Sequence, residues 1–249
     1  MLDTLRDIYS ILWVDLRVLR RRWLRTLATS LVNPILYLVA FGFGLGTGVK
    51  FEGYSYLEFI IPGIIALTAM TVSFNGAGTK LNVDRLFFKS FDECLMSPIN
   101  LYSIVVGKAL IGVVRGLISS TAFLIVGFAV EPSLSITPLF ITVLILSCFL
   151  FSFLGVLIAF LAKSHQDMST FSSLILLPMT FLSGTFFSLD QIPYAFKVIL
   201  YFLPLTHSSL CLRAAALDQS FPWLSLLVLS GFGLFFFSAS LMALKKTSV

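Results

Sequence analysis

Charged residues are scarce in this sequence. They make up 12% of its 249 residues, whereas 58% are hydrophobic and the mean hydropathy is +0.99. An ordinary soluble domain has about 25% charged and about 45–50% apolar residues. A soluble fold of this length could not bury so much apolar surface, so the composition excludes one.

Cysteine and histidine are also few. Cys94, Cys148 and Cys211 fall in three different regions, and an odd number cannot all pair within one chain, so the sequence predicts no disulfide framework. The two histidines, His165 and His207, are far apart along the chain. The sequence therefore predicts no metal site.

Motifs for nucleotide hydrolysis are missing as well. Gly107-Lys108 is followed by Ala109 rather than by the Ser or Thr of a phosphate-binding loop. The glycines of 42–48 lack the spacing of a dinucleotide-binding turn, and their repeat of four residues favours close helix packing, with a flexible helix end as the alternative. We expect no catalytic residues and no cofactor in this chain, so any pumping would need an outside source of energy.

Long apolar runs are what the sequence does contain. Six segments of almost entirely uncharged residues each reach the ~20 residues that a helix needs to cross a bilayer. Because backbone polar groups in lipid must be satisfied within each helix, the predicted fold class is all-α, a polytopic membrane protein forming a single domain over 1–249. The predicted spans are 31–49, 57–78, 101–130, 136–162, 168–189 and 221–244.

Lysine and arginine are distributed unevenly between the two sides of this bundle. With six spans, one side has twelve of them and the other has three, which are Lys50, Lys197 and Arg213. Cytoplasmic segments carry an excess of Lys and Arg, so both termini are predicted to be cytoplasmic. The twelve are Arg6, Arg17, Arg20, Arg21, Arg22, Arg25, Lys80, Arg85, Lys89, Lys163, Lys245 and Lys246.

The basic run LRVLRRRWLRTL, residues 16–27, contains five arginines. It predicts an amphipathic helix over 1–28 that lies at the membrane interface, because apolar residues recur at helical spacing beside the arginines. A span follows within a few residues, which argues against nucleic acid as a partner. The helix serves either as a topology anchor alone or also as a contact for a cytosolic protein. The apolar positions are Leu12, Leu16, Leu19, Trp23 and Leu27, and the interface residues are Trp13, Arg17, Arg20, Arg21 and Trp23.

Two segments between the spans have distinctive patterns. Residues 80–100 begin with charges and favour a short helix on the cytoplasmic side, which ends at Ser97 because Pro98 disfavours helix before it. Residues 190–219 are apolar but broken by prolines, which predicts two short re-entrant helices on the outer side. A seventh span over 194–217 is the alternative, although it would bury a lysine or an arginine.

These two segments resemble the permease subunits of ABC-2 type exporters, in the branch of nodulation lipo-oligosaccharide and daunorubicin-type drug exporters. The resemblance rests on ECLMSPI (93–99), on the pattern SGTFFSLDQIP (183–193) followed by PLTH (204–207), and on the six-span layout of the whole chain. Ser188 departs from the family, since many relatives have proline there. The outer signature residues are Gly184, Asp190, Gln191, Pro193, Pro204, Thr206, His207 and Arg213.

The resemblance implies the partners of the chain. It implies two permease copies, identical or related, that sit in lipid of a bacterial or archaeal cytoplasmic (inner) membrane with two cytosolic ATPase subunits, which hold ATP and magnesium. The permease itself is then not an enzyme. The segment before Pro98 would dock onto the ATPase, with lipid contact of its phenylalanines as the alternative. The coupling residues would be Asp84, Arg85, Phe91, Asp92, Glu93, Leu95, Met96, Ser97 and Pro98.

A translocation path is implied along the first and fifth spans. Its apolar gate would comprise Phe41, Phe43, Phe181, Phe186 and Phe187, although lipid contact or packing explains most phenylalanines in spans.

Two cations interrupt the third span, and charges at that depth are costly unless they reach water. Lys108 is predicted to extend to the cytoplasmic edge, while Arg115 either lies in a polar pocket or meets an anionic headgroup of a substrate.

The function predicted is export, driven by a separate ATPase, of a lipid-linked saccharide, polysaccharide, lipid or hydrophobic drug. The alternative is a membrane scaffold that recruits a cytosolic enzyme without transport. The sequence does not identify the cargo or decide between a homodimer and a heterodimer.

Overall fold

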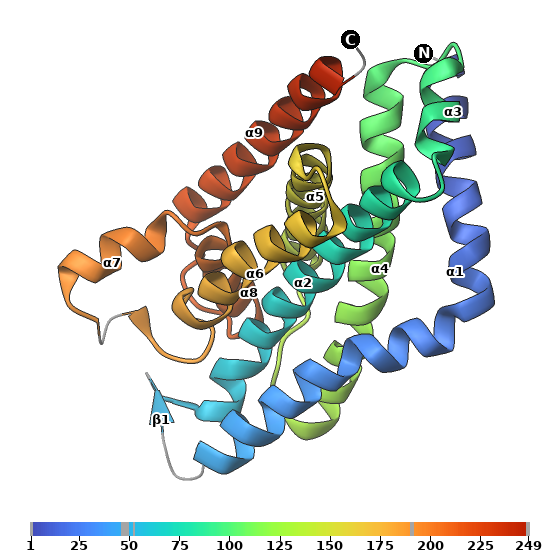
Figure 1. Ribbon diagram of the computed structural model, residues 1–249. Coiled ribbons are helices and arrows are strands. Elements are labelled where there is room, and N and C mark those ends of the chain that lie inside the picture. Colours follow the sequence, from blue (N-terminus) through green and yellow to red (C-terminus); the bar gives the residue numbers. More distant parts are fainter. Residues whose placement is uncertain (1, 46–49, 52, 190–191, 248–249) are drawn as a thin grey trace.

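The computed structural model describes residues 2–45, 50–51, 53–189 and 192–247. These residues form a helical bundle in which the first turns of α1, the last turns of α9 and the short helix α3 lie at the same end (Figure 1). In chain order the elements are α1 (Leu2–Tyr37), the π-helix η1 (Leu38–Leu45), β1 (Lys50–Phe51), β2 (Tyr54–Ser55), α2 (Tyr56–Leu86), α3 (Ser90–Met96), α4 (Leu101–Val130), α5 (Pro138–Leu161), α6 (His165–Leu182), α7 (Tyr194–Tyr201), α8 (Pro204–Ala216) and α9 (Trp223–Thr247). The all-α prediction is confirmed, and the strands are a two-residue antiparallel pair.

Five helices of the described residues are long and apolar enough to cross a membrane. They correspond to α1 with η1, α2, α4, α5 and α9. The predicted span 168–189 corresponds to α6, which ends at Leu182 and begins with the polar residues His165, Gln166 and Asp167. The chain is therefore a polytopic membrane protein, and the count of six spans stays a prediction.

The N-terminal helix differs from its predicted layout. The sequence predicted an interfacial helix over 1–28 and a separate span over 31–49, but α1 continues through residues 29 and 30 without a break. Its bend lies earlier, at Arg22, whose φ of −127° and ψ of 17° are not helical, and Figure 1 shows the two arms of α1 at a large angle. The turn to the membrane arm is thus made inside the basic run. Residues 46–49 lie outside the described part of the chain.

The central helix is α2, which packs against α4, α5 and α8. It begins with a capping box, in which the Ser55 hydroxyl accepts from Leu57 N and the Glu58 carboxylate accepts from Ser55 N. It crosses α5 at glycines, because a Cβ on Gly78 would lie 2.6 Å from the carbonyl oxygen of Gly155. Such close crossings are typical of membrane helices with small residues at the interface.

The loop and re-entrant predictions differ in their outcomes. Helix α2 runs eight residues past the predicted end of its span at 78 and occupies the first part of the predicted 80–100 loop. The remaining residues contain α3, and Ser97 is extended (ψ 149°) as expected before Pro98. In the predicted outer region 190–219 the chain forms two short helices, α7 and α8, rather than one long span. Figure 1 shows α7 standing apart from the bundle.

Candidate functional site

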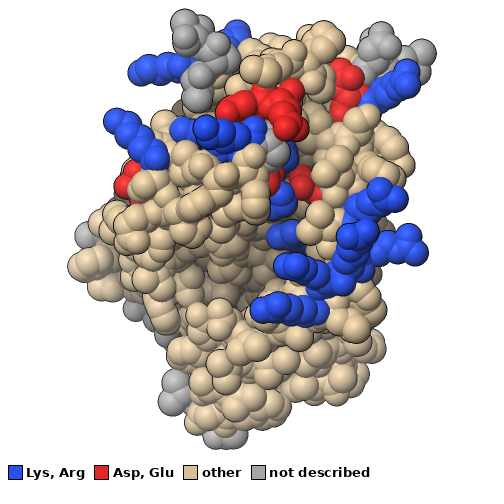
Figure 2. All heavy atoms as spheres, turned by 45° about the vertical axis from the view of Figure 1, so that its right-hand side comes forward, with Lys and Arg blue, Asp and Glu red and all other residues tan. Residues whose placement is uncertain are grey.

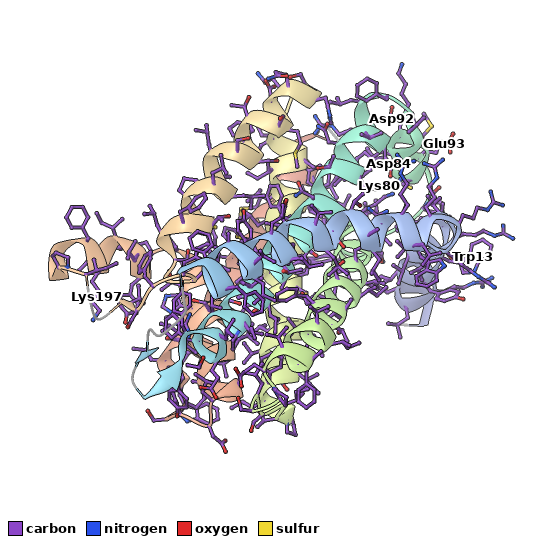
Figure 3. The ribbon with its side chains drawn as sticks, turned by 90° about the horizontal axis from the view of Figure 1, so that it is seen from below. Trp13, Lys80, Asp84, Asp92, Glu93 and Lys197 are labelled. Carbon is purple, nitrogen blue, oxygen red and sulfur yellow. The ribbon has the colours of Figure 1, made fainter. Side chains whose placement is uncertain are left out.

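The segment predicted to contact an ATPase lies at the end of the bundle where α2, α3 and α4 meet (Figure 3). Its outward surface is formed by Phe88, Asp92, Glu93 and Met96, with Phe88 72% and Met96 88% exposed. Ser97 and Pro98 are also exposed, and the Ser97 hydroxyl donates to the carbonyl oxygen of Glu93. A surface with two large apolar side chains and two carboxylates is therefore exposed on α3 and on the turn before it.

The inner side of α3 is anchored to the bundle. Phe91 is 1% exposed and its ring lies 5.6 Å from that of Phe160 on α5, while Leu95 packs against the core. Arg85 donates from one guanidinium nitrogen to the carbonyl oxygens of Ala159 (2.6 Å) and Phe160 (3.0 Å) at the end of α5. A cation there satisfies carbonyls that the helix end leaves unpaired. Phe91, Leu95 and Arg85 therefore hold the segment in place rather than present it to a partner.

Asp84 corrects the sequence prediction. It was expected to offer its charge to a partner protein, but it is 3% exposed and its carboxylate binds two lysines of the same chain. One oxygen accepts from Nζ of Lys80 and the other from Nζ of Lys108 at 2.9 Å. The long α2 places Asp84 inside the molecule, below α3, instead of in an exposed loop.

These residues complete a closed ring of four charges with Asp15 of α1. One Asp15 oxygen lies 3.3 Å from Nζ of Lys80 and the other 3.5 Å from Nζ of Lys108. Each lysine therefore contacts both aspartates, and the ring has no net charge. The ring joins α1, α2 and α4. We call the four residues Asp15, Lys80, Asp84 and Lys108 the ion ring. Lys108 was predicted to extend to the membrane edge, but it is 8% exposed because two carboxylates meet it inside the bundle.

The sequence pattern alone does not predict the ion ring. The sequence places Asp15 in an interfacial helix and Lys80 in a loop, so it does not predict that either residue meets Lys108. One signal was present: Ile11, Asp15 and Leu19 recur every four residues, and this is the face of α1 that is buried. The predicted apolar stripe was shifted from it, since Trp23 is 54% exposed.

The remaining residues predicted for the membrane interface stay on the outside of α1. The Arg17 guanidinium lies 4.6 Å from the centre of the Trp13 ring, and Arg20 and Arg21 are exposed. Trp13 projects from this end of the molecule in Figure 3. Rings and cations on one exposed surface suit the headgroup zone of a bilayer, so the interface assignment stays a prediction with suitable geometry.

The aromatic residues predicted for the path are only partly brought together. The rings of Phe41 and Phe186 stack at 4.4 Å, and Phe181 lies 6.2 Å from Phe186. Tyr37, which the sequence argument omitted, joins them at 5.3 Å from Phe186. Phe43 is exposed and Phe187 partly exposed, and neither takes part in these ring contacts. The cluster connects the end of α1 to the turn after α6.

Arg115 lies in a polar groove between α1, α2 and α4. The groove has a volume of about 460 Å³ and continues toward the bend of α1 as a second hollow of about 340 Å³. Figure 2 shows lysine and arginine side chains gathered beside a hollow on one face of the molecule. The lining residues other than Arg115 are Thr26, Thr29, Ser30, Asn33, Pro34, Thr71, Val72, Asn75, Gly76 and Thr79 in the first hollow, and Val18, Leu19, Arg22, Arg25, Thr26, Thr29 and Lys80 in the second.

The outer signature is organised around Arg213, which is 5% exposed. Its guanidinium donates from Nε to the carbonyl oxygen of Phe59 (3.1 Å) and from a terminal nitrogen to that of Gly184 (3.0 Å). It also lies 3.6 Å from the centre of the Phe59 ring. Gly184 has a φ of +67°, which side-chain-bearing residues rarely adopt. Arg213 therefore fastens α8 to the start of α2 and to the turn after α6.

The other signature residues shape the same region. The Thr206 hydroxyl donates to the carbonyl oxygen of Leu200 (2.7 Å), and His207 Nε2 lies 2.8 Å from that of Tyr201. Pro193 precedes α7 and Pro204 begins α8. The signature thus connects the two short helices to each other. Asp190 and Gln191 lie outside the described residues.

Comparisons with known proteins agree with this geometry. Residues 6–217 match the family described as ABC-2 type transporter. The inner membrane transport permease YadH of Escherichia coli (strain K12) is 28% identical over 189 residues, which are 75% of this chain and 73% of that protein. Nodulation protein J of Rhizobium leguminosarum bv. viciae is 31% identical over 214 residues, with 79% of this chain and 76% of that protein covered. The chain therefore belongs to the ABC-2 type transporter family.

Proposed function

We propose that this chain is the permease subunit of an exporter that moves a lipid-linked saccharide out of the cytoplasm with ATP hydrolysed by a separate subunit. The family assignment and the similarity to an inner membrane transport permease support transport through an inner membrane. The similarity to nodulation protein J supports a saccharide-bearing cargo, given the resemblance to lipo-oligosaccharide exporters. The functional assembly in this proposal contains two permease copies and two ATPase subunits, with both chain termini cytoplasmic.

The observation that carries the proposal is the construction of α3. Its outward surface exposes Met96 and two carboxylates, and the turn before it exposes Phe88, while Phe91 on the other side of α3 is held in the bundle. Only residues 97–100 separate α3 from α4. Because this connection is short, a displacement of α3 would also displace the start of α4. An exposed anchor with rigid attachment is what a force-transmitting contact with an ATPase requires.

Two surface variants test the docking. Deletion of residues 86–95 would also remove Phe91 from the core, so single changes at exposed positions are sharper. Glu93→Lys and Phe88→Asp should each weaken binding of the cognate ATPase at least tenfold, because central contacts of an interface contribute about 2 kcal/mol or more. Binding is measured by co-purification and by titration of the ATPase onto the permease in nanodiscs.

Glu131→Lys is the matched control, since Glu131 follows α4 at the opposite end from α3. It should bind the ATPase like the wild type, and all three variants should keep the wild-type midpoint of thermal unfolding. Wild-type yields of ATPase with both α3 variants would refute the docking site.

Transport itself is tested in proteoliposomes that contain permease and ATPase. In this proposal a lipid-linked saccharide raises the rate of ATP hydrolysis and appears on the opposite side of the membrane. A complex that forms but shows neither effect with saccharide, lipid or drug would favour the scaffold interpretation.

A further inference from the structure

The groove around Arg115 contains polar groups that lipid chains cannot satisfy. Asn33 of α1 and Asn75 of α2 are both exposed along its rim, although they lie within helices that are long and apolar enough to span a membrane. Thr29 is exposed beside them. Polar side chains at this depth are costly against hydrocarbon and face a water-filled or protein-lined space instead. This face of the subunit therefore borders a polar space.

Arg115 is built into the groove rather than left at its edge. A Cβ on Gly76 would lie 3.1 Å from Cδ of Arg115 and 3.2 Å from the Cα of Gly112. Gly76 therefore leaves room for the arginine side chain beside α2, while Gly112 lets α4 approach α2 closely. Its Nε is buried and makes no hydrogen bond with any residue in the described part of the chain. A buried donor without a partner is costly, and Arg115 lines both hollows, so an acceptor that enters the groove would offset this cost.

The electrostatic balance of the groove favours an anion. Asp15 and Asp84 are already shared by Lys108 and by Lys80, which lines the second hollow. No ion pair joins Arg22, Arg25 or Arg115 to a carboxylate within the described ranges. Arg22 and Arg25 line the hollow that leads from the bend of α1 to Arg115. Three arginines thus add positive charge to a groove where the aspartates are neutralised.

The donors match a phosphate group best. An arginine offers several N–H groups in a planar fork that fits the oxygens of a phosphate. Thr26 and Asn33 of α1 add further polar groups to the lining, whereas the hydroxyls of Thr29 and Ser30 already donate to backbone carbonyl oxygens of α1. Val72 and Pro34 give the wall an apolar part, which an acyl or prenyl chain could contact. We propose that the groove between α1, α2 and α4 binds the phosphate of an anionic lipid headgroup through Arg115, with Arg22 and Arg25 at its mouth.

The phosphate-bearing lipid is either the cargo or a resident lipid of the membrane. The cargo assignment rests on the proposed export function, whereas the binding itself does not. The first measurement therefore uses the full-length permease alone in detergent, titrated with dioctanoyl phosphatidic acid and followed by native mass spectrometry and thermal unfolding. The uncharged probe is dioctanoyl glycerol, which has the same chains without phosphate, and inorganic phosphate tests whether the headgroup alone competes.

Arg115→Gln should weaken binding of phosphatidic acid at least tenfold, because it removes a charge-assisted contact. Arg6→Gln is the matched control, since Arg6 is exposed on α1 but lines neither hollow. It removes the same charge and should leave binding within about twofold. The double variant Arg22→Gln/Arg25→Gln changes exposed residues only and should weaken binding several-fold, so the site is tested even if Arg115→Gln does not fold.

Equal weakening by Arg6→Gln and by the groove variants would overturn the proposal, since general attraction to a basic surface would then explain the binding. So would dioctanoyl glycerol binding as tightly as phosphatidic acid. The source is decided afterwards in the permease–ATPase complex. Loss of bound phosphatidic acid during ATP hydrolysis identifies the site with cargo, and retention identifies a resident lipid. If no complex forms, the proposed function fails while the binding result stands.

Discussion

The two ends of the bundle bury a cation in different ways. At the end that contains α3, Lys108 is held by the carboxylates of Asp15 and Asp84, which come from two other helices. At the end that contains α8, Arg213 is held by backbone carbonyl oxygens and by the ring of Phe59. The first arrangement depends on particular side chains of three helices, whereas the second depends mainly on the course of the backbone.

This difference bears on what each end can do. Losing any one member of the ion ring leaves an unbalanced charge inside the protein, so the ring makes the positions of α1, α2 and α4 depend on each other. The carbonyl oxygens of Phe59 and Gly184 that accept from Arg213 are neutral, so the contact of α8 with the start of α2 and with the turn after α6 is made through the backbone. The end next to the exposed α3 surface is therefore the one where a change in charge or position spreads among the helices.

The largest effect is expected from Lys108→Met. It leaves two aspartates with one lysine in a buried site, and breaking a buried ion pair costs about 3–5 kcal/mol. The measurement is the midpoint of thermal unfolding in detergent, together with the yield of monodisperse protein.

The double variant Lys108→Met/Asp84→Leu sharpens this result. It leaves the single pair of Asp15 and Lys80, so the charges balance again and much of the lost stability should return. A double variant that is less stable than Lys108→Met would contradict the ring as a charge-balanced unit.

Arg213→Lys should have a smaller but clear effect. A single ammonium group cannot reach the carbonyl oxygens of Phe59 and Gly184 with the planar geometry of a guanidinium, so at least one buried acceptor loses its donor. We expect a loss of about 2–3 kcal/mol in the free energy of unfolding, measured in the same assay.

Lys197→Arg is the control on the same side, because Lys197 lies on α7, away from the bundle (Figure 3). It keeps the positive charge, and the free energy of unfolding should stay close to that of the wild type. Full stability of Arg213→Lys would show that a positive charge alone, rather than the geometry of the guanidinium, is enough to hold α8 against the start of α2.

Phe59→Leu separates the two kinds of contact that Arg213 makes. It removes the ring beneath the guanidinium and part of the packing of a residue that is 3% exposed, but it keeps the carbonyl acceptor, so a loss of about 1–2 kcal/mol is expected. A loss as large as that of Arg213→Lys would mean that the ring contributes as much as the carbonyls do.

The smallest effect concerns the thiol of Cys94 on α3. Burial raises its pKa, so less of it is thiolate at neutral pH and it should react with a membrane-impermeant maleimide more slowly than an exposed cysteine. Met96→Cys provides that exposed cysteine two residues away. Its rate should exceed that of Cys94 several-fold, and the two rates should approach each other as the pH rises above 9.

The same labelling tests the predicted orientation. In right-side-out vesicles neither position should react until the membrane is opened. Rapid reaction in sealed vesicles would place α3 outside and would overturn the cytoplasmic assignment of the termini.

Some of this structure could be read directly from the chain. The span 101–130 agrees with α4 at both ends, because Pro98 before it and the polar EPS segment after it (131–133) are local signals. The break at Ser97 and the two short helices after residue 193 follow from prolines in the same way. The bend at Arg22 could not be read, since arginine is a good helix former and nothing nearby breaks the helix.

By itself the sequence determined the membrane class, the helical fold, the family and the helix boundaries that prolines or polar segments mark, such as those of α4. Hydropathy, prolines and signature residues act locally or one span at a time, so they can be read in order. Only the tertiary structure decided three features. Asp15, Lys80, Asp84 and Lys108 form the ion ring, Arg213 donates to a carbonyl oxygen at the start of α2, and Arg115 lines a groove. These contacts join residues from separate helices, and which faces of those helices meet depends on close packing at positions such as Gly78 and Gly155.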